Sequence, residues 1–163
     1  MNHKTELLAG DLAVDHFNNG LLCAESVLTT LAHVQGIESQ YLPKIATAFC
    51  SGMARSCGTC GALTGAMMGL SLHLGRSDTS QSVQSTYEAT QKLISEFEGE
   101  FGAKDCHMLL GCDIGTEEGM AQFKELQLIK QCKQYTRRAT EIAATIIVEK
   151  TPNKNYYYAY FSG

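Results

Sequence analysis

Apolar side chains recur along most of the chain at the three- and four-residue intervals that are typical of helices. Between Leu22 and Gln35, an apolar face begins at Cys23 and continues through Leu31 to Val34. The same periodicity predicts helices over 5–18, 39–49, 59–74, 78–101 and 117–149, the last with a break near 131–134. Residues 50–59 and 102–116 are expected to be irregular, apart from one helical turn at 106–110.

These elements predict an all-α fold, since the span between the only two prolines, Pro43 and Pro152, lacks the strongest helix breaker. We expect one domain over residues 1–150, built as a bundle of five or six helices around a central Gly/Ala-rich helix. The helix over 78–101 is expected to bury a face that includes Tyr87 and Phe97. Residues 151–163 hold four of the seven tyrosines and are expected to be a docked arm or a disordered tail.

The helix over 59–74 is unusual because its small residues share one face. That face consists of Gly61, Ala62, Gly65, Ala66 and Gly69. Each glycine costs a helix roughly 0.5–1 kcal/mol relative to alanine, so a compensating contact is expected. Either another helix approaches closely, or a cofactor lies against Gly61 and Gly65; the two interpretations have equal weight here.

Composition and charge narrow the class of protein. The net charge of −4 and the scattered basic residues argue against nucleic-acid binding. The start of the chain lacks the apolar core of a signal peptide, and the most apolar stretch, 62–74, is too short to cross a bilayer. We therefore expect a cytoplasmic protein that does not insert into membranes.

Seven cysteines are many for such a chain, and the odd number does not suit a secreted disulfide framework. Clustered cysteines in a reducing compartment are more often metal ligands or redox thiols, although free cysteine also fills cores. Cys23 and Cys132 lie on apolar helix faces and are expected to point inward. The cysteine spacings match no zinc-finger or ferredoxin pattern, so the residues alone leave redox, metal binding and packing open.

Cys57 and Cys60 form a C-x-x-C motif at the start of the glycine-rich helix. A helix N-terminus stabilises a thiolate, and Arg55 adds positive charge nearby, so we expect a lowered thiol pKa there. Such a pair suits a redox dithiol or half of a metal site. The βαβ context of thioredoxin is absent from the predicted elements.

Four segments together resemble the C_GCAxxG_C_C family of redox-active proteins, which is related to the cysteine-rich domain of split-Soret cytochromes. They are "FNNGLLCAESVL" (17–28), "TCGALTGAMMGLSLHLG" (59–75), "CHMLLGCD" (106–113) and "CKQYTRRATEIA" (132–143). The resemblance implies Cys23, Cys60, Cys106 and Cys132 as the four family cysteines. Cys50, Cys57 and Cys112 are additional, and "CSGMARS" (50–56) stands where the family has a more glycine-rich stretch.

Three hypotheses follow from the thiols and the resemblance. The first is an iron–sulfur centre for electron transfer to an unidentified partner, with Cys23, Cys60, Cys106 and Cys132 as ligands and Cys57 and Cys112 as further candidates. The second is a metal-free thiol–disulfide protein with Cys57 and Cys60 as the catalytic pair. The third is a zinc-stabilised or purely structural helical protein. A homodimer is expected, because two-fold dimers are the commonest assembly.

Overall fold

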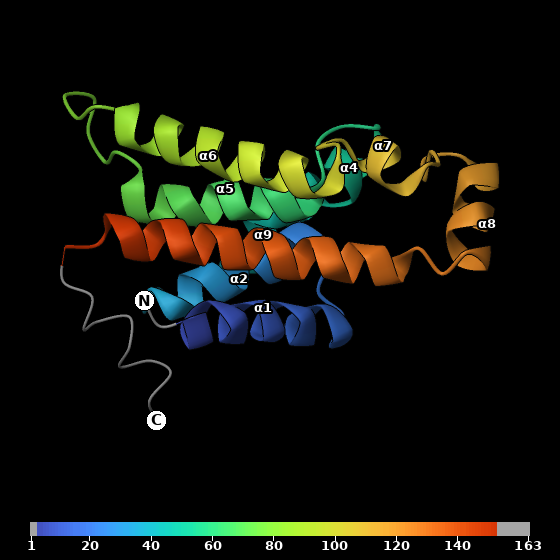
Figure 1. Cartoon of the computed structure of the whole chain (residues 1–163), viewed down its shortest axis with the longest axis horizontal. Helices are drawn as coiled ribbons and strands as arrows, with labels where there is room; N and C mark the ends of the chain where they lie inside the picture. The colour runs from blue at the N-terminus through green and yellow to red at the C-terminus, as the bar shows by residue number, and fades with distance from the viewer. Residues whose placement is uncertain (1–2, 153–163) are drawn as a thin grey trace.

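Nine α-helices and a short 3-10 turn account for most of residues 3–152, the part of the chain that this computed structural model describes (Figure 1). They are α1 (His3–Asn18), α2 (Cys23–Val34), α3 (Leu42–Ala46), η1 (Thr47–Phe49), α4 (Cys50–Arg55), α5 (Gly61–Leu74), α6 (Gln84–Phe101), α7 (Cys106–Leu110), α8 (Glu117–Glu125) and α9 (Ile129–Lys150). One isolated antiparallel bridge joins Thr59 to Asp105, and no strand occurs in this range. The predicted all-α class is confirmed.

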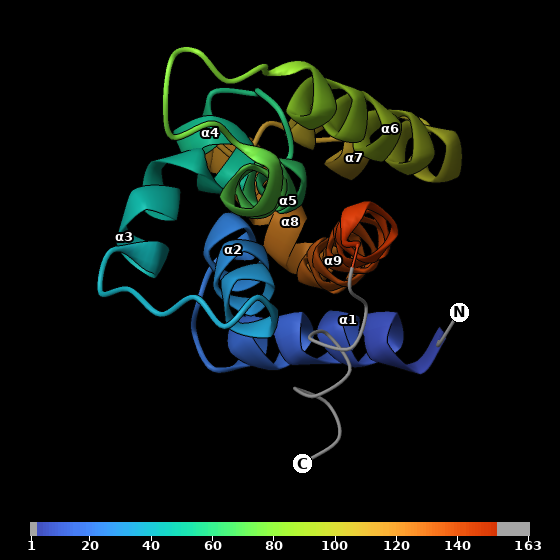
Figure 2. The same cartoon turned by 90° about the vertical axis from the view of Figure 1, so that its left-hand side faces the viewer.

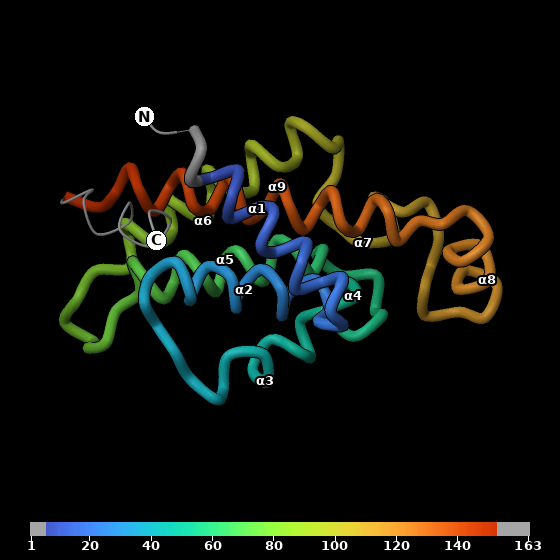
Figure 3. The backbone as a smooth tube through the Cα atoms, turned by 90° about the horizontal axis from the view of Figure 1, so that it is seen from below, coloured from blue at the N-terminus to red at the C-terminus, as the bar shows by residue number. Residues whose placement is uncertain are grey.

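Five long helices, α1, α2, α5, α6 and α9, form the bundle (Figure 2). The glycine-rich α5 packs on α2, α6 and α9, while α9 also contacts α1 and α2, so the two helices share the central position. The short elements α4, α7 and α8 gather at one end of the bundle, which two perpendicular views show (Figures 1 and 3). No helix of residues 3–152 is long and apolar enough to cross a membrane.

Close helix packing explains most of the small face of α5. A Cβ atom added to Gly65 would lie 2.6 Å from the carbonyl oxygen of Ala24, and one added to Gly69 would lie 2.3 Å from the Leu31 side chain. Both contacts are on α2, so the backbones of the two helices approach each other directly. The cost of the glycines in α5 is thus offset by packing against α2.

Two helices differ from their predicted form. Helix α6 begins at Gln84, and its buried residues are Ala89, Leu93 and Phe97, whereas Tyr87 is 59% exposed. Phe97 is buried as predicted and Tyr87 is not, so the inward face is rotated relative to the predicted one, because contacts with α5 and α9 set the rotation of α6. The break in the last helical region lies at residues 126–128, where Gln127 has a φ of +52°, and not at 131–134.

The helix α4 is a left-handed turn. Its backbone angles are φ 55°, ψ 42° at Ser51, φ 61°, ψ 53° at Gly52, φ 54°, ψ 72° at Met53 and φ 58°, ψ 38° at Ala54. Each L-residue in this conformation costs roughly 1–2 kcal/mol, and single residues rather than runs are the rule. Residues 50–59 were expected to be irregular; the strain concentrated there must be balanced by contacts elsewhere in the fold.

The predicted tail over 151–163 is described only at its first two residues, and residues 153–163 lie outside the described range. The Thr151 hydroxyl oxygen lies 2.7 Å from the Ile147 carbonyl oxygen, to which it donates, and 3.1 Å from Nε2 of His73. The end of α9 is therefore held against the end of α5.

The left-handed turn predicts that alanine-to-glycine substitutions inside and outside it change the free energy of unfolding in opposite directions. We expect Ala54→Gly to raise the free energy of unfolding by about 0.5–1 kcal/mol, because glycine adopts a positive φ without steric cost. Ala121→Gly, in the ordinary right-handed helix α8, should lower it by roughly 0.5–1 kcal/mol. Urea denaturation of both variants measures the difference, and a destabilised Ala54→Gly protein would contradict the left-handed conformation.

The helix contact at Gly65 generates a second test. Gly65→Ala should lower the free energy of unfolding by about 1–3 kcal/mol, because the added methyl group overlaps the backbone of α2. Gly99→Ala in α6 is the matched control, since nothing lies within 4 Å of its added Cβ atom. This control should stabilise the protein by about 0.5–1 kcal/mol. Equal effects of the two substitutions would show that α2 and α5 do not pack as described.

Candidate functional site

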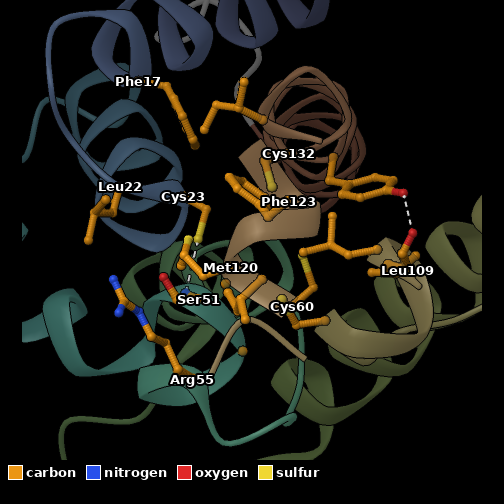
Figure 4. A pocket seen from close by; sticks show the side chains of 17 residues that line it. Phe17, Leu22, Cys23, Ser51, Arg55, Cys60, Leu109, Met120, Phe123 and Cys132 are labelled. Atoms are coloured by element: carbon orange, nitrogen blue, oxygen red, sulfur yellow. Dashed lines mark hydrogen bonds between the residues drawn. The ribbon is translucent and has the colours of Figure 1, made fainter. Parts of the chain in front are cut away.

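A cavity of about 240 Å³ lies at the end of the bundle where α4, α7 and the start of α9 meet (Figure 4). Four cysteines from four different segments line it: Cys23, Cys60, Cys106 and Cys132. Cys23 and Cys106 are the first residues of α2 and α7, Cys60 is the N-cap of α5, and Cys132 lies in the first turn of α9. The fold thus brings together thiols that lie far apart in the sequence.

The rest of the lining is mainly apolar. It includes Phe17, Leu22, Leu109, Leu110, Ile114, Met120, Phe123 and Ile129. Leu22 and Ile129 are 44% and 38% exposed and Arg55 is also exposed, so these residues form a rim that meets solvent. The volume is below the ~300–1,000 Å³ of pockets that take drug-sized ligands, so the cavity suits a small group.

A short antiparallel pairing positions two of the thiols. The Cys60 N–H donates to the Lys104 carbonyl oxygen, and the Cys106 N–H donates to the Gly58 carbonyl oxygen, both at 2.8 Å. These bonds flank the bridge between Thr59 and Asp105. They tie the segment before α5 to the segment before α7, and both cysteines therefore face one cavity.

The start of α2 is held by a buried glutamate. The Leu22 N–H donates to Oε2 of Glu25 at 2.9 Å, and the Thr47 hydroxyl donates to Oε1 at 2.7 Å. Glu25 is 8% exposed. Its carboxylate therefore caps α2 and links it to η1, which fixes the position of Cys23 beside the left-handed turn.

Burial is the main influence on the pKa of three lining thiols, those of Cys60, Cys106 and Cys132. It raises the pKa of Cys60 to about 12, although hydrogen bonds from the backbone N–H groups of Ala62 and Leu63 act in the opposite direction. Burial likewise raises the pKa of Cys132 to about 12 and that of Cys106 to about 11. The lowered pKa expected at the N-terminus of α5 is therefore corrected: the helix N–H groups favour the thiolate, but desolvation outweighs them.

Cys23 accepts a hydrogen bond from the left-handed turn. The Ser51 N–H lies 3.4 Å from the Cys23 sulfur (Figure 4). Gly61 makes room for this sulfur, because a Cβ atom added there would lie 2.3 Å from it. In the same way, Gly52 leaves space for Cys106, whose Cβ atom would lie 2.4 Å from an added methyl group. The missing side chains of Gly61 and Gly52 thus leave the space that Cys23 and Cys106 occupy.

The other predicted site residues have different surroundings. Gly61 lines the cavity, but Gly65 lies against α2. Cys57 and Cys112 are outside the lining, and Cys57 faces Asp113, whose hydrogen bond raises the pKa of this thiol. Cys57 and Cys60 are close in sequence but have different neighbours. Within residues 3–152, no group of three Cys, His, Asp or Glu side chains is arranged around a single metal-ion position.

Two residues of the site had no clear signal in the sequence. The Tyr135 hydroxyl donates to the Leu109 carbonyl oxygen at 3.1 Å, and its ring meets Phe101 edge-on with 4.9 Å between centroids. This tyrosine is buried and lines the cavity. Ser51 acts through its backbone N–H, which no residue pattern reveals.

A family model described as "Putative redox-active protein (C_GCAxxG_C_C)" matches residues 21–146 of the chain. The match spans all four cysteines of the cavity. Neither the curated proteins nor the solved structures contain a match.

The raised pKa values generate a labelling prediction. In the reduced, metal-free protein at pH 8, iodoacetamide should modify Cys60 and Cys132 at least about tenfold more slowly than Cys57, because burial raises the pKa of both thiols to about 12 and keeps them protonated. Their rates should increase as the pH is raised toward 10, as the thiolate fraction grows. Mass spectrometry of samples quenched over time measures each rate, and rapid labelling of Cys60 at pH 8 would contradict the assignment.

Proposed function

We propose, given that the chain belongs to the C_GCAxxG_C_C family of redox-active proteins, that it transfers electrons through an iron–sulfur cluster. Cys23, Cys60, Cys106 and Cys132 would hold the cluster. The observation that carries this proposal is the shared cavity: four thiols from α2, α7, α9 and the start of α5 line one small, largely apolar space.

The donor set suits this group. Four cysteine thiolates are the usual ligands of [2Fe–2S] and [4Fe–4S] clusters. The four thiolates would be shared among more than one iron atom, so these four cysteines need not converge on a single ion position. The lack of a single-ion arrangement among the described residues is compatible with that requirement.

The chain's own groups supply the environment that tunes such a centre. The Ser51 N–H donates to the sulfur of Cys23, and the N–H groups of Ala62 and Leu63 donate to that of Cys60. Hydrogen bonds to sulfur stabilise added negative charge and raise a reduction potential. Arg55 places a positive charge at the rim, and the apolar lining limits access of water. A cluster bound there would accept and release single electrons.

Loading this site requires proton release. At neutral pH the thiols of Cys60, Cys106 and Cys132 are protonated, because burial raises their pKa to about 12, 11 and 12. Iron binds thiolates, so each ligand must lose its proton on binding. Affinity should therefore increase with pH over the range in which the thiols are still protonated.

Metal analysis of protein purified without air tests the proposal. We expect iron and acid-labile sulfide in stoichiometric amounts, with visible charge-transfer absorption. Replacement of any one of the four lining cysteines by alanine should remove most of this absorption. Cys57→Ala is the matched control and should retain it, because Cys57 is outside the lining.

Two outcomes would contradict the proposal. One is colourless, iron-free protein after reconstitution with iron and sulfide. The other is an iron content that depends on Cys57 and not on Cys132. Stoichiometric zinc without colour would instead assign the cavity to a structural site.

A further inference from the structure

Cys50 lies next to Cys23 but is outside the lining of the cavity. A Cβ atom added to Gly61 would lie 2.3 Å from the Cys23 sulfur and 3.0 Å from the Cys50 Cα atom. The Cys23 sulfur and the Cys50 Cα atom are therefore separated by no more than the sum of these two distances. The Ser51 N–H, next in the chain after Cys50, is 3.4 Å from the same sulfur. Both cysteines are free thiols in this structure.

The two thiols have different surroundings. Cys50 is 2% exposed, and its thiol donates to the Ala46 carbonyl oxygen at 3.5 Å. A hydrogen bond with Cys23 is the main reason that the pKa of Cys50 lies far above its usual range, and burial adds to it. Cys23 is half-buried and lines the cavity. A reagent in the cavity can thus reach Cys23, whereas the Cys50 thiol beside it is outside the lining and shielded.

We propose that Cys23 and Cys50 form a reversible dithiol–disulfide couple, in which Cys23 attacks a small disulfide from the cavity and Cys50 resolves the product. The placement of one accessible and one shielded sulfur side by side is what such a couple requires.

The reaction balances with a small-molecule disulfide as the oxidant. The Cys23 thiolate forms a bond to one sulfur of the reagent, the reagent's S–S bond breaks, and one thiol leaves with the proton lost by Cys23. The Cys50 sulfur then attacks the Cys23 sulfur, loses its proton and displaces the second thiol. Two protein thiols are oxidised, and one reagent disulfide is reduced to two thiols.

This couple differs from the Cys57–Cys60 pair that the sequence suggested. Cys60 faces the cavity, whereas Cys57 faces Asp113 outside its lining. The proposal goes beyond the iron–sulfur function and needs no metal, so each can fail without the other. A disulfide between Cys23 and Cys50 would, however, withdraw Cys23 from any set of metal ligands.

Disulfide mapping of the full-length, metal-free protein tests the couple. The reduced protein is exposed without air to hydroxyethyl disulfide, quenched with acid, blocked with N-ethylmaleimide, digested and analysed by mass spectrometry. The first intramolecular disulfide should link Cys23 to Cys50, and added mercaptoethanol should reverse it. In Cys50→Ala and Cys50→Ser, the mixed disulfide at Cys23 should increase severalfold, because no thiol resolves it.

Cys57→Ala is the matched control and should form the Cys23–Cys50 link as readily as the unchanged protein. Circular dichroism confirms that each variant keeps its helix content, and the use of two residues at position 50 guards against a packing defect in one of them. A first disulfide that joins any other pair would overturn the proposal. So would an unchanged level of mixed disulfide at Cys23 in folded Cys50 variants.

Discussion

The direct contact between the backbones of α2 and α5 is the constraint on which the site depends. At Gly65 no side chain separates the two helices, and at Gly61 the space of a side chain is taken by the sulfur of Cys23. Because α5 approaches α2 so closely, Cys23 and Cys60 lie at the same end of the bundle. A larger residue on this face would push the helices apart and separate the first two thiols of the cavity.

The cavity combines two opposing influences on its thiols. Helix N-termini and backbone N–H groups favour the thiolate, whereas the apolar walls favour the neutral thiol. Desolvation is the larger influence at Cys60, Cys106 and Cys132, so these thiols are protonated at neutral pH. Protonated thiols are weak nucleophiles, and they become thiolates when a metal binds and displaces their protons. This behaviour is expected of metal ligands more than of a solvent-exposed nucleophile.

The backbone turn beside the cavity is strained by a run of positive φ angles. Residues 51–54 adopt positive φ angles, which glycine tolerates best, yet this chain has serine, methionine and alanine at three of the four positions. The strain directs the Ser51 N–H toward Cys23, and Cys50 adds a second sulfur at the same point. Strained backbone often occurs at functional sites in proteins. Here the strained turn places the Ser51 N–H within hydrogen-bonding distance of the Cys23 sulfur.

The sequence by itself determined the helical class and most helix positions, because helical periodicity acts over a few residues. The cost of glycine predicted a close contact on the small face of α5, but only the structure showed that α2, and not a cofactor, makes this contact at Gly65 and Gly69. It also indicated, through a family resemblance, which four cysteines belong together. Only the tertiary structure decided which thiols are neighbours: Cys57, three residues from Cys60, faces Asp113, whereas Cys50 contacts Cys23 beside the start of α5. The rotation of α6 and the left-handed turn were likewise not predicted. These features depend on contacts between segments that are distant in the sequence, and local sequence patterns do not predict such contacts.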